Sequence, residues 1–344
     1  MLSKIKRAMQ MFSKNIVIDL GSENTIIASY LENVGQENVI NIQPTSVAYN
    51  SSTDEIYIGS DADKLIDKSP DFKIINPIKN GVIIDDAVAV KLVRELTGKI
   101  VKNSLFVNWN FYIAIPSSSS AVDIRMFKEV LYDAGAGNVY LIDSTLATAL
   151  GAGLDINSDK TYMILNIGAD VTELGVISMK KTIFQKTFRI GGSNICNAII
   201  SIVRDVYGVS IGYKTAMRLL KQLGTFNITN ENRFDSIEVQ GKSINIGDIR
   251  VAKRISVTRS EVYDAIIYVF NDLMNKVGDE MSTIPSDTIS EIMSSGLYLS
   301  GGVSNISGIN DFISNTIGVK SFIVEDSKMA IVNGLIKTVK MHLK

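Results

Sequence analysis

Two stretches of the chain share one pattern, and this repeat constrains the fold more than any other feature. Residues 15–21 form an apolar run that ends in an Asp-Leu-Gly turn, and residues 25–30 form a second apolar run. About 147 residues later, 160–168 and 172–178 repeat the arrangement, again with glycine at the turn. Each pair predicts a strand–turn–strand hairpin. The repetition predicts an α/β protein built from two related halves.

Composition excludes several classes of protein. A length of 344 residues favours two domains, and 46% hydrophobic residues suffice for two cores. The net charge of -1 offers no basic excess to displace counterions, so we expect no nucleic-acid partner. The chain has one cysteine, Cys196, and one histidine, His342, which excludes an internal disulfide and a zinc site and argues against histidine-based catalysis. No signal peptide is visible, which favours a reducing cytoplasm.

The first 14 residues have the pattern of an interfacial helix. At 100° per residue, one face collects apolar side chains, namely Leu2, Ile5, Ala8, Met9 and Phe12. Lysines and arginine flank or oppose that face without an intervening acid, which suits an anionic membrane surface. The alternative is a disordered or core-docked helix. No uncharged apolar run approaches the length of a spanning helix.

The rest of the chain alternates strands and helices. Residues 39–85 mix short strands and turns and predict a small inserted subdomain. A second insertion is predicted at about 191–254. We expect further strands at 111–116, 137–142 and 296–302, and helices at 86–99, 121–134, 146–152, 194–207, 213–223, 262–277 and 305–316. Ser120 with Asp123 predicts a helix cap.

Three loops carry the candidate chemistry. In the first, 19–25, Gly21 lets backbone amides approach a phosphate, Ser22 and Asn24 add side-chain donors, and Asp19 suits a magnesium ion, reached through water. The second loop, 166–173, is predicted to face the first across a cleft. In the third, 300–305, paired glycines permit close approach of a flat ring or ribose. Alone, each loop is more typical of an ordinary turn; their order and spacing together are specific.

In this order the loops resemble those of the superfamily of actins, heat-shock chaperone ATPases and sugar kinases, and within it the MreB family. Residues 18–25 resemble that family's first phosphate loop, DLGTANT, and 141–153 its connecting segment, LIEEPLAAAIGAG. Residues 189–194 stand in the place of RIAGDEMD, and 299–302 resemble the adenosine loop, LTGGG. The resemblance runs from about residue 14 to the C-terminus.

The resemblance implies an actin-like fold: two ribonuclease-H-like cores, each with an inserted subdomain, and a nucleotide cleft between them. The implied parts are a membrane-binding segment (1–14), subdomain IA (15–38, 86–150 and 334–344), IB (39–85), IIA (151–190 and 255–333) and IIB (191–254). It also implies ATP or ADP with Mg²⁺, bound at Asp19 as the metal ligand. The implied nucleotide-binding residues are Gly21, Ser22, Glu23, Asn24, Asn166, Gly168, Thr172, Gly192, Gly301, Gly302 and Val303.

The chain departs from the family at the residues that would promote hydrolysis. In the second loop the family has DIGGGTTE; here Asn166 replaces an acid, Ala169 and Asp170 replace glycines, and Val171 removes a hydroxyl. The connecting-segment glutamate that orients the attacking water becomes Asp143, one methylene shorter. Because loss of a positioned base costs on the order of 10²–10⁴ in rate, we expect retained nucleotide binding with slow hydrolysis.

The function that the resemblance implies is an ATP-binding cytoskeletal protein. It would polymerise with itself into paired protofilaments, peripheral on the inner face of the cell membrane, for cell shape or motility. If it is an enzyme, it is a slow magnesium-dependent ATPase. One alternative is an actin-fold scaffold that works without nucleotide. A less favoured alternative is a small-molecule kinase of the same superfamily, because no catalytic aspartate beside an acceptor pocket is visible.

Overall fold

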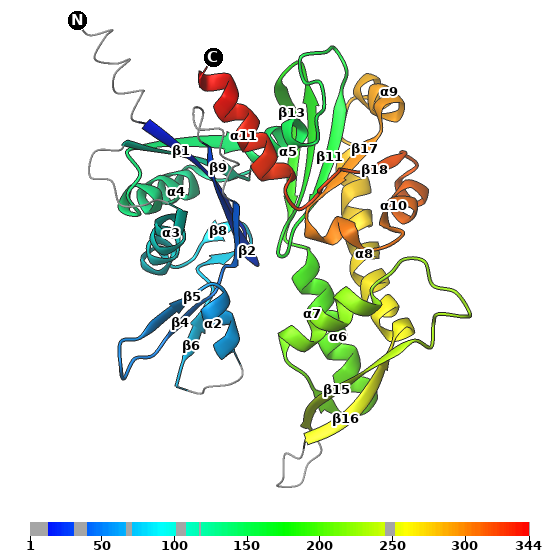
Figure 1. The fold of residues 1–344 in the computed structure, drawn as a ribbon. Coiled ribbons are helices and arrows are strands. Elements are labelled where there is room, and N and C mark those ends of the chain that lie inside the picture. Colours follow the sequence, from blue (N-terminus) through cyan, green and yellow to red (C-terminus); the bar gives the residue numbers. More distant parts are fainter. Residues whose placement is uncertain are drawn as a thin grey trace, which may run out of the picture. The chain divides into compact units, whose positions relative to one another are not determined.

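The structure is a computed structural model that describes residues 13–30, 40–66, 71–100, 108–116, 118–244 and 252–343. The chain divides into two units. Unit 1 comprises residues 1–160, 175–187 and 328–344, and unit 2 comprises 161–174 and 188–327 (Figure 1). The boundaries of the four implied subdomains stay a prediction. The amphipathic segment 1–14 lies outside the described residues except at its end.

The first predicted hairpin is confirmed and opens a five-stranded sheet. Strand β1 (Ser13–Leu20) pairs antiparallel with β2 (Asn24–Tyr30), and β3 (Ile40–Pro44) extends the sheet beyond β2. On the other side of β1 lie β9 (Asn108–Ile115) and β10 (Asn138–Asp143), both parallel to it. The order is β10-β9-β1-β2-β3. Three neighbouring parallel strands therefore end at one edge of this sheet.

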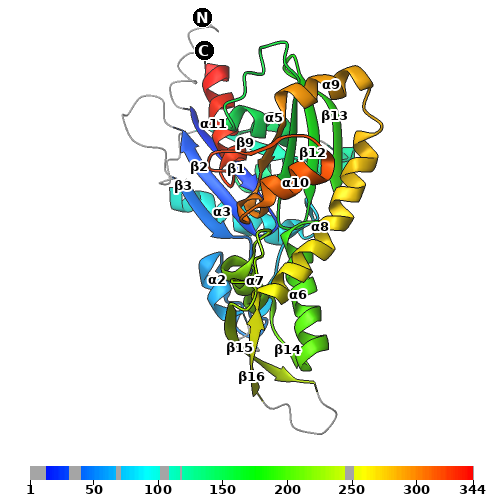
Figure 2. The ribbon, with the colours of Figure 1, turned by 90° about the vertical axis from the view of Figure 1, so that its right-hand side faces the viewer.

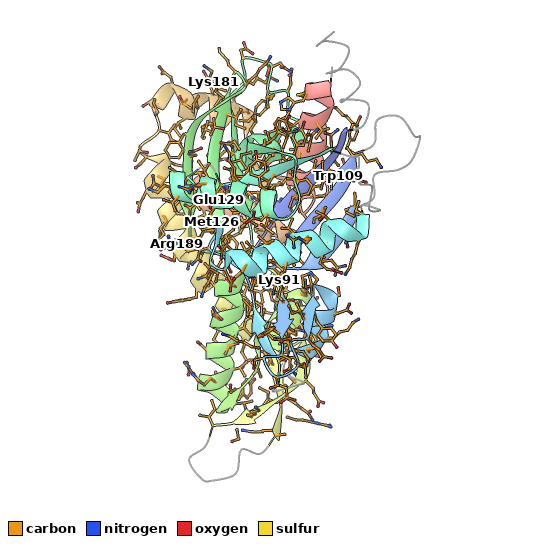
Figure 3. The ribbon with its side chains drawn as sticks, turned by 90° about the vertical axis from the view of Figure 1, so that its left-hand side faces the viewer. Lys91, Trp109, Met126, Glu129, Lys181 and Arg189 are labelled. Carbon is orange, nitrogen blue, oxygen red and sulfur yellow. The ribbon has the colours of Figure 1, made fainter. Side chains whose placement is uncertain are left out.

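Helices cover both faces of this sheet. Alternate residues of β1 and β9 face α3 (Asp86–Ile100) and α4 (Ala121–Asp133) in one core. Figure 3 marks these two helices by Lys91, Met126 and Glu129. The intervening residues face α5 (Ser144–Gly151) and α11 (Ala330–Leu343) in a second core. Burial on both faces explains why β1 and β9 are continuous apolar runs.

A ladder of asparagines fixes the register of the three parallel strands. The Asn110 Nδ2 donates to Asn15 Oδ1 at 3.0 Å, and Asn138 Nδ2 donates to Asn110 Oδ1 at 2.9 Å. These residues are direct neighbours across the sheet. A slip of one residue would break both side-chain bonds and turn every core side chain to the other face.

The second hairpin heads a sheet of the same order. This sheet contains β11 (Tyr162–Ile167), β12 (Thr172–Ser178) and β13 (Lys181–Phe188). It is extended beyond β11 by β17 (Leu297–Ser300) and β18 (Ser321–Ile323). The order is β13-β12-β11-β17-β18, with β17 parallel to β11 and β18 parallel to β17. The repeat in the sequence is thus a repeat of sheet topology.

Unit 2 is built around the long helix α8 (Arg259–Met281). Helices α6 (Gly192–Tyr207) and α7 (Tyr213–Leu223) pack against it, as Figure 2 shows. Helix α10 (Ile309–Ile317) also contacts α8. The buried stripe of α8 at helical spacing confirms the sequence interpretation of that segment as core.

Shorter elements complete the two units. In unit 1 they are β4 (Val47–Tyr49), β5 (Ile56–Ile58), α2 (Ser60–Leu65), β6 (Lys73–Ile75), β7 (Ile78–Lys79) and β8 (Val82–Ile83). In unit 2 they are β14 (Val209–Ser210), β15 (Ser236–Ser243), β16 (Ala252–Thr258), α9 (Ser286–Ser295) and the 3₁₀ helix η1 (Gly302–Asn305). Strands β4–β6 form one small sheet and β14–β16 another.

Two further predictions from the sequence can be compared with the structure. The predicted cap of α4 is confirmed: Ser120 Oγ accepts from the Asp123 N–H, and the Asp123 carboxylate accepts from the Ser120 N–H. Among the described residues, no helix combines the length and the apolar character that crossing a bilayer requires.

Helices α5 and α11 touch at two glycines. An ideal Cβ on Gly151 would lie 1.7 Å from the Ala330 carbonyl oxygen, and one on Gly334 would lie 1.7 Å from the Ala147 carbonyl oxygen. No side chain larger than hydrogen fits at either position, so the helix backbones themselves form this contact.

We predict that Gly334→Ala lowers the free energy of unfolding by roughly 1–3 kcal/mol or more, because the added methyl group forces the two helices apart. Gly98 in α3 is the matched control, since nothing lies within 4 Å of a Cβ placed there. Gly98→Ala is expected to be neutral or to stabilise by up to about 1 kcal/mol. Urea denaturation followed by circular dichroism measures both. Equal stability of the two variants would contradict the contact.

Candidate functional site

The first loop is a tight turn closed by a backbone hydrogen bond. The Gly21 N–H donates to the Asn24 carbonyl at 3.2 Å. An ideal Cβ on Gly21 would lie only 2.8 Å from that carbonyl oxygen, so a side chain would open the turn. Glycine is required here by space rather than by an unusual backbone angle.

Two residues that follow β2 in the chain, Thr45 and Asn76, orient this loop. The sequence patterns had indicated no role for them. Thr45 Oγ1 donates to the Gly21 carbonyl at 2.7 Å, and the Thr45 N–H donates to the Glu23 carbonyl at 2.9 Å. Asn76 Nδ2 donates to the carbonyl between them, that of Ser22. Three consecutive carbonyls of the loop are therefore held by donors from residues 45 and 76.

Holding the carbonyls also fixes the amides. In a planar trans peptide the C=O of one residue and the N–H of the next point in opposite directions, and the described residues contain no cis bond. The bonded carbonyls of Gly21, Ser22 and Glu23 thus set the directions of the three N–H groups that follow them. Successive oriented amides of this kind are a general anion-binding arrangement.

Two carboxylates lie at the same edge of the first sheet. Asp19 is next to the last residue of β1, and Asp143 is the last residue of β10, one strand beyond β9. Both are half-buried. Asp143 Oδ1 also accepts from the Leu146 N–H at 2.9 Å and so caps α5. The residue predicted to position water therefore has a structural role as well.

The second loop repeats the geometry of the first. The Gly168 N–H donates to the Val171 carbonyl at 2.9 Å, and Gly192 N–H donates to the Gly168 carbonyl at 3.1 Å. The next carbonyl, that of Ala169, accepts from the Ser193 N–H at 2.7 Å. Ser193 Oγ lies 2.8 Å from Asp170 Oδ1, so the added acid of this loop is bound to the start of α6.

Asn166 is central to the second loop. Its Oδ1 accepts from Ser300 Oγ at 3.1 Å, and its Nδ2 donates to Glu173 Oε2 at 3.3 Å. Glu173 is buried. An amide can accept from one neighbour and donate to the other, whereas an aspartate at 166 would place a second carboxylate against Glu173. Thr172, also buried, donates from Oγ1 to the Ile190 carbonyl at 2.7 Å.

The third loop lies against the second within unit 2. Gly301 has φ +88°, and an ideal Cβ would lie 2.3 Å from the Ile167 carbonyl oxygen and 2.7 Å from Asn166 Oδ1. Around Gly302, in contrast, a Cβ would meet nothing within 4 Å. Val303 Cγ2 would lie 3.1 Å from a Cβ on Gly192. Close approach of a ligand is thus sterically open at Gly302.

The structure therefore brings the predicted residues together as two clusters. Asp19, the loop 21–24 and Asp143 belong to unit 1, and the other predicted residues belong to unit 2. Sequence reasoning missed the residues that support each loop, namely Thr45, Asn76, Glu173, Ser193 and Ser300. In the part of the chain that is described, no group of three or more histidine, cysteine or acidic side chains is arranged to hold a metal.

Comparisons with known proteins agree on one family. The model of the MreB/Mbl protein family matches residues 13–344. The cell shape-determining protein MreB of Pasteurella multocida (strain Pm70) is 30% identical over 348 residues, which cover 98% of this chain and 97% of that protein. The MreB of Escherichia coli (strain K12) is 29% identical over 344 residues, covering 98% and 96%.

Solved structures share the fold. The crystal structure of MreB5 of Spiroplasma citri bound to ADP superposes with a TM-score of 0.86 at 24% identity, covering 96% of this chain and 98% of that one. The MamK double helical filament gives a TM-score of 0.78 at 14% identity, covering 95% and 99%.

We predict that Asn166→Asp makes stability depend on pH. Two neighbouring carboxylates repel when both are ionised, so the folded variant binds protons more readily than the unfolded chain. Relative to the parent, its stability is therefore retained near pH 4 and lost as the pH rises to 7, by on the order of 1 kcal/mol. Thermal unfolding at several pH values measures this difference.

The control is the double variant Asn166→Asp with Glu173→Gln, which restores one amide beside one carboxylate. It is expected to lose the extra pH dependence. A single variant whose stability follows that of the parent between pH 4 and 7 would show that the two side chains do not interact.

Proposed function

This chain belongs to the MreB/Mbl family of bacterial actin-like cytoskeletal proteins, and on that premise we propose that it binds ATP with Mg²⁺ and polymerises. The predicted actin-like fold is confirmed by the likeness to MreB5 and MamK. The observation that most supports nucleotide binding is the first loop. Its three oriented amides come directly after the end of β1, at the sheet edge that carries Asp19 and Asp143.

The residues present fit a nucleotide. Amides that follow the bonded carbonyls of Gly21, Ser22 and Glu23 would bind phosphate oxygens, and Ser22 and Asn24 add side-chain donors. The open space at Gly302 suits the flat face of a base or ribose. MreB5 of Spiroplasma citri has been solved with ADP and with AMPPNP, which supports the same ligand class here.

Magnesium would be held at Asp19, with Asp143 at the same sheet edge. Mg²⁺ typically uses one or two protein carboxylates together with phosphate oxygens and water. The absence of a cluster of three acids among the described residues is therefore compatible with this metal. When bound, the ion would neutralise charge on the phosphates; Asp19 would orient it, and Asp143 would orient water.

We propose that hydrolysis is slow. Asp143 is short and already caps α5 through Oδ1, which limits its freedom to follow a water molecule. Asn166 supplies an amide where the family has an acid, and its two hydrogen bonds keep it in place. Both features retain the loop geometry while weakening the groups that would activate water.

We predict tight ATP binding with little phosphate release by the parent chain. The variant Asn166→Asp/Asp143→Glu, which restores the family's residues, is expected to release phosphate roughly tenfold faster or more. Binding of a fluorescent ATP analogue and release of phosphate, both with Mg²⁺, measure the two properties on the same protein.

The outcomes separate the candidate functions. Binding by neither protein would leave a scaffold that works without nucleotide. Rapid turnover by the parent would show that these substitutions do not slow hydrolysis. Asp133→Glu, at the end of α4, is the control for lengthening an acid away from the site.

Self-assembly is the proposed activity of the nucleotide-bound protein. The MamK relative has been solved as a double helical filament, which supports polymerisation of this chain. The cell shape-determining relatives support a role in cell shape, and motility is the alternative output of the same filament.

We also propose that the filament binds an anionic membrane surface through residues 1–14. The support is the sequence pattern, since residues 1–12 lie outside the described part. Deletion of residues 2–12 is expected to abolish co-sedimentation with vesicles of anionic lipid, because both the apolar face and its cations are lost. The parent is expected to bind anionic vesicles in a salt-dependent way and neutral vesicles weakly. Equal binding by the deletion variant would refute this.

A further inference from the structure

The inserted segment of unit 1 is bonded directly to the first loop. Thr45 lies between β3 and β4, and Asn76 lies between β6 and β7, so the two residues bracket the small sheet β4–β6 (Figure 1). Together they donate to three consecutive loop carbonyls.

Thr45 is at the centre of a buried network. It is 1% exposed, and its hydroxyl lies 2.7 Å from the Gly21 carbonyl and 2.8 Å from Thr25 Oγ1. A hydroxyl has one proton, and the carbonyl cannot donate, so Thr45 donates to Gly21 and accepts from Thr25. Removing this one oxygen would leave the half-buried Gly21 carbonyl and the buried Thr25 hydroxyl without this partner.

Asn76 completes the connection from the other end of the segment. Its Nδ2 donates to the Ser22 carbonyl, while its Oδ1 accepts from the Ile78 N–H at 3.1 Å. The side chain therefore joins the loop to the first residue of β7. A change in the direction of the Ser22 carbonyl must be accompanied by a shift of this junction or by loss of the bond.

The second half of the chain has the corresponding arrangement. Gly192 and Ser193, at the start of α6, donate to the carbonyls of Gly168 and Ala169. In both halves the donors come from the segment that follows the hairpin. The same solution with different residue types indicates that support of the turn carbonyls is a requirement of this loop.

We propose that Thr45 and Asn76 are positioning residues that set the amides of loop 21–24 for phosphate and couple phosphate binding to the sheet β4–β6. The inference rests on the proposed nucleotide function. Since coupling between two sites is reciprocal, a phosphate bound by the loop amides stabilises the bonds to Thr45 and Asn76 and so protects the segment they bracket.

The experiment uses the full chain with Mg²⁺ and an ATP analogue. Thr45→Val removes the hydroxyl at nearly constant shape, Thr45→Ser keeps it, and Thr97→Val is the matched control. Thr97 is also buried and donates to a carbonyl, that of Val93 in α3 at 2.7 Å, away from the loop. Analogue affinity and hydrogen exchange of residues 47–75, with and without analogue, are the readouts.

Thr45→Val is expected to weaken analogue binding about five- to tenfold, the effect of losing one oriented contact, and to abolish analogue-induced protection of 47–75. Thr45→Ser and Thr97→Val are expected to bind and to be protected like the parent. If Thr45→Val binds the analogue as tightly as the parent, or if Thr97→Val loses as much affinity as Thr45→Val, this inference is overturned but the proposed function is not. A parent chain that binds no analogue would overturn the proposed function as well.

If Thr45→Val does not fold, Asn76→Asp tests the same connection at an exposed position. It replaces the donor by a carboxylate oxygen facing the Ser22 carbonyl, and weaker binding is expected. Asn41→Asp is its control, because Asn41 lies in β3 and its Oδ1 accepts from Gln43 Nε2 rather than serving the loop. Unchanged binding by Asn76→Asp would overturn the role of Asn76.

Discussion

One local backbone hydrogen bond, made twice, underlies both candidate loops. In each hairpin the glycine N–H closes the turn on the carbonyl three residues later, at 3.2 Å for Gly21 and 2.9 Å for Gly168. Within the turn that this bond closes, Thr45 and Asn76, or Gly192 and Ser193, donate to the loop carbonyls. The orientation of every amide that could bind an anion depends on this turn.

The second constraint is the parallel pairing of β1, β9 and β10. Because parallel strands end at one edge, Asp19 and Asp143 share that edge although they are 124 positions apart in the sequence. The asparagine ladder and the cores on both faces fix this register. The position of the carboxylates thus follows from the packing of the sheet, and not from the loops alone.

Sequence patterns predicted the hairpins, the main helices and the cap at Ser120 because these depend on local periodicity and on residues three or four apart. They did not predict Thr45 or Asn76, since a bond from a side chain to a carbonyl 24 or 54 residues away leaves no periodic signal. The substitution at Asn166 was visible as a departure. Its hydrogen bonds to Ser300 and Glu173 became visible only in the structure. Ser300 is distant in sequence, and the spacing to Glu173 matches no pattern that predicts a contact.

The contact of α5 with α11 has a consequence for how the protein is made. Helix α11 supplies Val332, Leu335 and Val339 to the second core of unit 1, yet it follows the whole of unit 2 along the chain. On the ribosome, the part of this sheet face that α11 covers therefore stays uncovered until α11 has been synthesised, although α5 already covers the rest. Unit 1 begins to form first but cannot be completed first, and the nascent chain must be protected from aggregation throughout that interval.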